Sequence, residues 1–166
     1  MDLKDKKTIL ITGSSRGIGA ELAKICKDSG LKVILHGRAK SKELITLSKK
    51  LEADYIFFDV TKELEVKNAL INIQKLNIIV NCAGINISKP FEALDISDWQ
   101  AVYNANVFGI VNVLRYALPL LKKNKSISKV INVASVKGTY SAVGRAAYAS
   151  SKAAVINMTS SLAKEF

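Results

Sequence analysis

The chain has 166 residues, of which 49% are hydrophobic, and this length suffices for one domain with its own core, which we expect to span residues 1–166. No stretch approaches the roughly 18 consecutive apolar residues of a membrane span, and the charged segment 1–7 does not resemble a signal peptide. We therefore expect a cytoplasmic protein without a membrane partner. The net charge of +11, from 25 basic and 14 acidic residues, favours acidic ligands. The basic residues are scattered without an interleaved aromatic platform, so nucleic acid is not a predicted partner.

A strand, a glycine-rich turn and a helix follow one another near the start of the chain. Residues 8–12 form a β-branched apolar run, typical of a buried parallel strand. The turn Gly13–Gly19 comes next and leads into a helical pattern. We expect that helix to turn one apolar face to the sheet, formed by Ile18, Leu22, Ile25 and Cys26. This context favours a dinucleotide site over a chance glycine pattern.

Each glycine of the turn has an expected role. Gly13 would permit the tight turn, Gly17 would let backbone approach a phosphate closely, and Gly19 would let the helix lie against the strand. The free N–H groups and positive dipole end of the helix would bind a pyrophosphate. For the glycines alone, the alternative is a turn that simply needs flexible residues.

Strands and helices alternate along the rest of the chain. Further strands are predicted at 32–36, 55–58, 77–81 and 129–133. Helices are predicted at 42–51, 63–74 and 99–121, with Pro119 bending or ending the third, and a last helix begins near Gly144 or Arg145. Right-handed crossovers place these strands in the order 3-2-1-4-5, in an α/β, doubly wound, Rossmann-type parallel sheet.

The two cysteines, Cys26 and Cys82, both fall in apolar-patterned elements. We expect two buried free thiols rather than a disulfide or a metal site. No histidine lies near the predicted catalytic residues and no pair of acids stands out, so hydrolase and metal chemistry are not favoured.

Tyr148 and Lys152 are four residues apart in an Ala-rich, helical stretch, which places both side chains on one helix face. An ammonium held beside a phenol favours the phenolate, and such a pair can move a proton near neutral pH. Taken alone, Tyr and Lys on a solvated helix face are the commoner explanation.

Four motifs in one order resemble the short-chain dehydrogenase/reductase family. They are Thr12-Gly-x-x-x-Gly-x-Gly19, Asn81-Cys-Ala-Gly84, Asn106, and Ser135 followed by Tyr148 and Lys152. The resemblance runs from about Lys6 to Phe166, and the 3-oxoacyl-(acyl-carrier-protein) reductases look similar over this region. Family members normally continue through two more strands, so the resemblance implies a shortened domain in which the fifth strand is an open apolar edge.

The resemblance assigns a role to each predicted catalytic residue. Tyr148 would pass a proton to a carbonyl oxygen as hydride arrives, and Lys152 would make that transfer easier and hold the nicotinamide ribose. Ser135 would polarise the substrate carbonyl. Asn106 would anchor a water that leads protons towards Lys152.

The end of the second strand predicts the cofactor. NAD-selecting relatives place an acid where this chain has Gly37, followed by Arg38, and Arg16 of the glycine turn would face the same phosphate. Two cations and no acid here favour NADP(H). His36 is interpreted as structural or adenosine-facing. The resemblance adds Asp59 and Val60 beside the adenine, and it completes the cofactor set with Ser15, Ile18, Asn81, Ala83 and Gly84; Cys82 stands where the family more often has asparagine.

The predicted reaction is reduction of a ketone, including a 3-oxoacyl thioester, to a secondary alcohol. Lysines at 122–129 would attract an acyl-carrier-linked substrate, although solvated surface lysines explain the same charges. The alternative is a shortened family member that binds nucleotide or a partner subunit without efficient turnover. In relatives, the helices matching 99–121 and 144–166 pack between subunits, which implies a homodimer or homotetramer.

Overall fold

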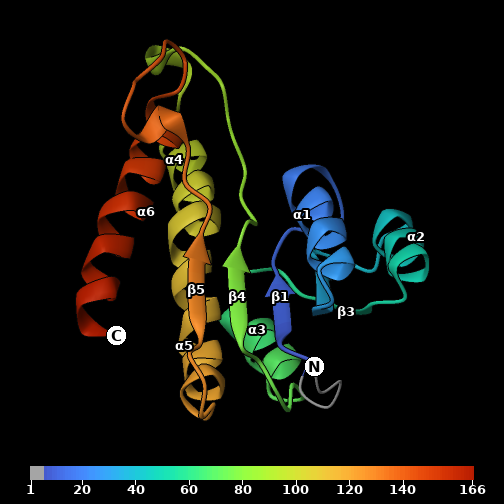
Figure 1. The fold of residues 1–166 in the computed structure, drawn as a ribbon. Helices are drawn as coiled ribbons and strands as arrows, with labels where there is room; N and C mark the ends of the chain where they lie inside the picture. Colours follow the sequence, from blue (N-terminus) through green and yellow to red (C-terminus); the bar gives the residue numbers. More distant parts are fainter. Residues whose placement is uncertain (1–5) are drawn as a thin grey trace.

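The structure, a computed structural model, describes residues 6–166. Within them, five parallel strands form one sheet in the order β3-β2-β1-β4-β5, which confirms the predicted fold class (Figure 1). The strands are β1 (Thr8–Ile11), β2 (Lys32–Gly37), β3 (Asp54–Phe57), β4 (Ile78–Asn81) and β5 (Lys129–Asn132). Each lies within one residue of its predicted bounds, because short apolar runs mark the strands clearly, even the partly exposed edge strands β3 and β5.

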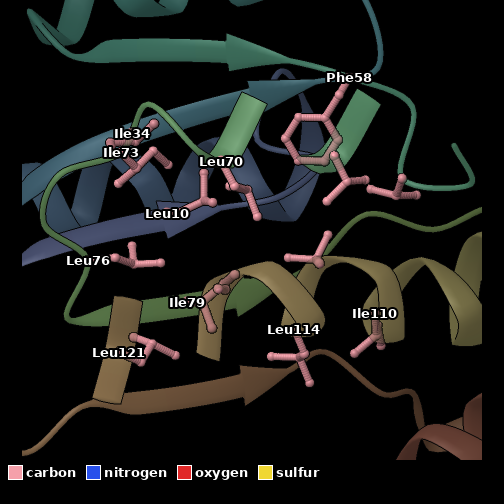
Figure 2. Packing of buried hydrophobic residues seen from close by; sticks show 14 of the residues in the cluster. Leu10, Ile34, Phe58, Leu70, Ile73, Leu76, Ile79, Ile110, Leu114 and Leu121 are labelled. Carbon is pink, nitrogen blue, oxygen red and sulfur yellow. The ribbon is translucent and has the colours of Figure 1, made fainter. Parts of the chain in front are cut away.

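Helices cover both faces of the sheet. Leu10, Ile34 and Ile79 point from β1, β2 and β4 into one apolar cluster with side chains of α3 and α5 (Figure 2). Ile9 and Leu35 belong to the cluster on the other face, which α1 and α2 cover. The helices are α1 (Gly17–Asp28), α2 (Lys42–Leu51), α3 (Glu63–Leu70), α4 (Ile96–Tyr103), α5 (Gly109–Lys122) and α6 (Ala146–Glu165). Alternating strand residues thus supply two cores from one sheet.

The buried face of α1 differs from the predicted one. Ile18 and Ile25 are 72% and 61% exposed, so two of the four predicted core residues face outward. The helix turns small residues to the sheet instead, namely Gly19, Ala20, Ala23 and Cys26. A Cβ on Gly19 would lie 2.5 Å from the Gly13 carbonyl oxygen. The turn therefore brings α1 so close at Gly19 that no side chain fits there.

The predicted helix 99–121 is three helical segments in sequence. A π-helical turn, η3 (Asn104–Phe108), separates α4 from α5 and contains the buried Asn106. Pro119 does not end α5, which continues to Lys122. At α3 the prediction was too long, because the helix stops at Leu70 rather than at residue 74.

Two loops rise beyond the carboxyl ends of the strands. The segment after β4 carries the short turn η2 (Phe91–Ala93), and the segment after β5 carries η4 (Val136–Gly138). Lys89 N–H donates to the Gly144 carbonyl at 3.2 Å, which ties the two loops together beside α4 and α6 (Figure 1). Across residues 6–166, none of the helices combines the length and apolarity that crossing a membrane requires.

Candidate active site

A cleft of about 910 Å³ lies at the carboxyl ends of the strands. Its walls come from the glycine turn after β1, the ends of the other four strands, the start of η3 and the start of α6. Ligands of doubly wound sheets bind at this edge, where the strand order reverses. Predicted site residues that line the cleft are Gly13, Ser15, Arg16, Gly17, Ile18, Gly19, Arg38, Asp59, Val60, Ala83, Gly84, Tyr148 and Lys152.

The glycine turn leaves the start of α1 open to the cleft. Arg16 is the N-cap of α1, and no side chain caps the first N–H groups of this helix. Gly17 has φ +59°, and a Cβ there would meet no other atom within 4 Å. Unpaired helix N–H groups beside open space form an anion site, so this turn fits a pyrophosphate.

The cleft end beside β2 carries cations and acids together, and Asp59 after β3 is one of these acids. Arg38 and Arg16 both line it, as predicted, and the chain has Gly37 at the end of β2. Glu43 in the first turn of α2 also lines it. Its own backbone N–H and Ser41 lower the pKa of the Glu43 carboxyl, with a smaller contribution from Arg16. No acid directly follows β2, as the sequence indicates, but α2 begins at Lys42 and its first turn adds the Glu43 carboxyl to this end of the cleft.

Tyr148 and Lys152 meet at the opposite end of the cleft. They lie on the first turns of α6, and the Lys152 Nζ atom is 6.0 Å from the centroid of the Tyr148 ring. Lys152 is 6% exposed and donates to the Val133 carbonyl at 2.7 Å. Burial lowers the pKa of the Lys152 ammonium, and Cys82 partly offsets this effect. The i, i+4 spacing thus places a phenol and an amine in one cleft.

Asn106 joins the loop after β4 to α6. Its Oδ1 atom accepts from the Ile85 N–H at 2.8 Å, and its Nδ2 atom donates to the Ile85 carbonyl and to Ser151 Oγ, both at 3.0 Å. A Cβ on Gly84 would lie 2.8 Å from Asn106 Oδ1 and 3.8 Å from Lys152 Nζ. The π turn therefore directs Asn106 to a point beside Lys152, although Asn106 does not line the cleft.

Two further predicted site residues lie outside the cleft wall. The Ser135 Oγ atom, directly after β5, accepts from the Lys137 N–H at 3.1 Å. Asn81 is 2% exposed, and its Nδ2 atom donates to Asn132 Oδ1 at 2.8 Å, which joins β4 to β5. Asn81 Oδ1 finds no hydrogen-bond partner among residues 6–166. Asn81 thus joins two strands beneath the cleft and does not line the cleft itself.

For two residues at the cleft the prediction from sequence was incomplete: Thr12 received no role, and Cys82 was expected to be buried. Thr12 Oγ1 accepts from the N–H groups of Cys82 and Ala83 at 3.0 and 3.1 Å, so it ties the ends of β1 and β4 together. Its place directly before Gly13 was the available signal. Cys82 lines the cleft and is only half-buried, whereas Cys26 is buried as expected; both thiols are free.

Comparison with known proteins identifies the family of this fold. A model of the short-chain dehydrogenase family matches residues 7–166. The chain belongs to that family. The 3-oxoacyl-(acyl-carrier-protein) reductase of Thermotoga maritima is 33% identical over 168 residues, which cover 96% of this chain and 68% of the reductase.

Solved structures resemble this short-chain dehydrogenase closely. Gluconate 5-dehydrogenase from Burkholderia cenocepacia, in complex with NADP and tartrate, has a TM-score of 0.89 and 30% identity, over 98% of this chain and 66% of its own. A short-chain dehydrogenase/reductase from Burkholderia phymatum, in complex with NAD, has a TM-score of 0.88 and 26% identity, over 100% of this chain and 62% of its own. The chain therefore spans just under two thirds of these two structures, and both nicotinamide cofactors occur among its relatives.

The histidine of this short-chain dehydrogenase is buried in the neutral form. His36 is 2% exposed, and burial lowers the pKa of its imidazole from 6.5 to about 4, despite opposing contributions from Phe58 and Asp59. Between these pH values the unfolded chain binds a proton that the native protein does not. The contribution of His36 to stability is therefore complete above about pH 6.5 and is lost as the pH falls towards 4.

We expect the contribution of His36 to the free energy of unfolding to fall by roughly 3 kcal/mol across that window. Urea unfolding at pH 7.5 and 4.5 measures it, with His36→Asn as the control, because asparagine does not titrate. The wild type should lose more stability than the variant over the same interval. Equal losses in the two proteins would contradict a buried neutral imidazole.

Proposed function

We propose that the protein is an NADP(H)-dependent reductase that converts a ketone to a secondary alcohol. The observation that carries the proposal is one cleft with an open glycine turn at one end and the pair Tyr148 and Lys152 at the other. The reductase and dehydrogenases among its relatives favour catalysis over nucleotide binding without turnover.

The residues at the two ends of the cleft divide the work. The glycine turn and the first N–H groups of α1 would hold the pyrophosphate of a dinucleotide, and Lys152 would hold its nicotinamide ribose. When bound, the nicotinamide would supply the hydride that the substrate carbonyl carbon receives. The fit rests on the open space at Gly17 and on the uncapped start of α1.

Tyr148 supplies the proton in this proposal. Its hydroxyl would donate to the carbonyl oxygen as negative charge develops there, and the phenolate left behind would regain its proton through Lys152. Ser135 directly follows the cleft-lining Ala134, and its hydroxyl would turn into the cleft to donate a hydrogen bond to the same oxygen. Asn106, which holds Ser151 of α6, would keep the Tyr148 turn in place. Hydride and proton together convert C=O to CH–OH.

Arg38 and Arg16 support a preference for NADP(H), because their side chains would bind its 2′-phosphate. We expect Arg38→Ala to weaken NADPH binding by about tenfold or more, because a charge-assisted hydrogen bond is lost, and to change NADH binding by less than about twofold. Fluorescence titration measures both constants, and Lys40→Ala provides a matched loss of charge outside the cleft wall. Equal weakening of both nucleotides by Arg38→Ala would contradict this role.

A panel of carbonyl compounds tests which class of substrate the protein reduces. The similarity to the Thermotoga reductase and the lysines at 122, 123, 125 and 129 support a 3-oxoacyl thioester on an acidic carrier. Purified protein with NADPH, 3-oxoacyl thioesters and simple ketones, followed at the nicotinamide absorbance, decides the matter. Nucleotide binding without turnover of any ketone would sink the proposal.

Exposed apolar side chains on one face of the protein support an assembly of several copies. Phe108 and Val111, at the junction of η3 and α5, are 54% and 42% exposed and offer an apolar surface for a second copy. A homodimer or homotetramer in the cytoplasm is proposed, and light scattering of the purified protein tests the oligomeric state.

A further inference from the structure

His36 connects two elements of the cleft through its side chain. The residue is next to last in β2, and its ring lies 4.0 Å from the Phe58 ring, centroid to centroid. Its Nδ1 atom accepts from the Gly13 N–H at 2.9 Å, and its Nε2 atom lies 3.0 Å from the Phe58 carbonyl oxygen. An N–H cannot accept and a carbonyl cannot donate, so the proton sits on Nε2 and Nδ1 is free of one.

The backbone of His36 holds the next residue of the same turn. The Ser14 N–H donates to the His36 carbonyl at 2.9 Å, and the His36 N–H donates to Ser14 Oγ at 2.8 Å. Gly13 has φ +67°, and a Cβ there would lie 2.8 Å from Ala83 Cα. One residue of β2 therefore fixes the first two residues of the glycine turn, while the segment after β4 restrains the turn from the other side.

We infer that His36 is a positioning residue of the dinucleotide site, whose ring nitrogen Nδ1 holds the glycine turn in the shape that receives a pyrophosphate. The inference rests on the proposed dinucleotide-binding function. The Gly13 N–H is occupied by the ring, so the turn presents the later N–H groups, at Gly17 and beyond, to the ligand. A turn freed from the ring would have to be ordered again by the ligand, at a cost in affinity.

Protonation of the ring would put two N–H groups against each other at Nδ1 and break this contact. Asp59, after β3, is the charged group that acts on the ring; the turn after β1 presents only backbone and Ser14 to it. Nucleotide binding should therefore weaken as the pH falls and the neutral form of the imidazole is lost.

Two substitutions separate the ring's contacts. In His36→Asn, the side-chain oxygen takes the place of Nδ1 and restores an acceptor for Gly13. In His36→Gln, the longer amide reaches the place of Nε2 and leaves Gly13 without its acceptor. At pH 7.5 we expect NADPH and NADH to bind His36→Asn within about threefold of wild type and His36→Gln at least about tenfold more weakly.

The measurements are fluorescence titrations with both nucleotides and thermal unfolding of each variant. A purely structural role of His36 would lower the melting temperatures of both variants but leave their dissociation constants for a given nucleotide equal. Equal affinities of His36→Asn and His36→Gln would therefore overturn the inference. Wild-type protein that binds neither nucleotide would refute the proposed function instead. If His36→Gln does not fold, ¹⁵N NMR of the single histidine decides, because a proton found on Nδ1 at neutral pH also overturns the inference.

Discussion

Tyr148→Phe should lower kcat by about 10²- to 10⁴-fold, the usual contribution of a positioned general acid. The substitution removes one hydroxyl and keeps the ring, so NADPH affinity should change by less than about threefold. Lys152 stays in place because its Nζ atom donates to the Val133 carbonyl and not to the tyrosine. A loss confined to turnover would assign the proton step to this hydroxyl.

Tyr140→Phe is the matched control. Tyr140 lies on the loop after η4, is 75% exposed and does not line the cleft, so the same loss of a hydroxyl should leave kcat unchanged. Steady-state rates with NADPH and the best ketone of the panel, together with fluorescence titration, measure both effects. More than about a tenth of wild-type turnover in Tyr148→Phe would show that another group delivers the proton.

The site depends on a helix that is fixed from several directions. Gly138 of η4 packs against the backbone of α6, since a Cβ there would lie 2.9 Å from Ala153 N. Asn132 of β5 donates to Thr159 Oγ1 at 2.9 Å, one to two turns beyond Lys152. With Asn106 on Ser151, these contacts hold α6 against both the sheet and the π turn. Rigid support of this kind is what a proton-transfer pair requires.

Local patterns predicted the sheet well and the helix faces less well. A strand in the middle of a parallel sheet is short and apolar on both sides, so β1, β2 and β4 stand out from the sequence, and the edge strands β3 and β5 still keep a short apolar run. The face of α1 could not be predicted in this way, because the close approach at Gly19 favours alanine over the larger Ile18 and Ile25. Hydrophobic periodicity records which residues are apolar, whereas the packing distance decides which of them fit.

Contacts between distant residues limited the prediction of the site. The Gly13 bond to His36 spans 23 positions, and the Thr12 bonds to the loop after β4 span 70 and 71. A single sequence contains no signal for such pairs, so His36 was assigned no definite contact and Thr12 no role. Motif residues at fixed spacing were accessible, because the helical repeat alone brings Tyr148 and Lys152 together.

Gly17→Ala should raise the dissociation constant for NADPH at least about tenfold, since the new methyl group would occupy the open space that a phosphate must enter. Gly30→Ala is a close control. Gly30 has φ +82° and also has no neighbour within 4 Å of an added Cβ, so both substitutions place alanine in left-handed backbone. Each should cost roughly 1–2 kcal/mol of stability.

The two glycines differ in their position on α1. Gly17 begins the helix at the cleft, whereas Gly30 follows its far end, where its N–H donates to the Lys27 carbonyl at 2.9 Å. Twelve residues at 1.5 Å each separate the two sites by roughly 18 Å. Urea unfolding should therefore give similar losses for both variants, and fluorescence titration should show weakened NADPH binding for Gly17→Ala alone. Equal affinities would mean that the dinucleotide does not approach the start of α1, because backbone strain is common to both and only proximity to the cleft distinguishes them.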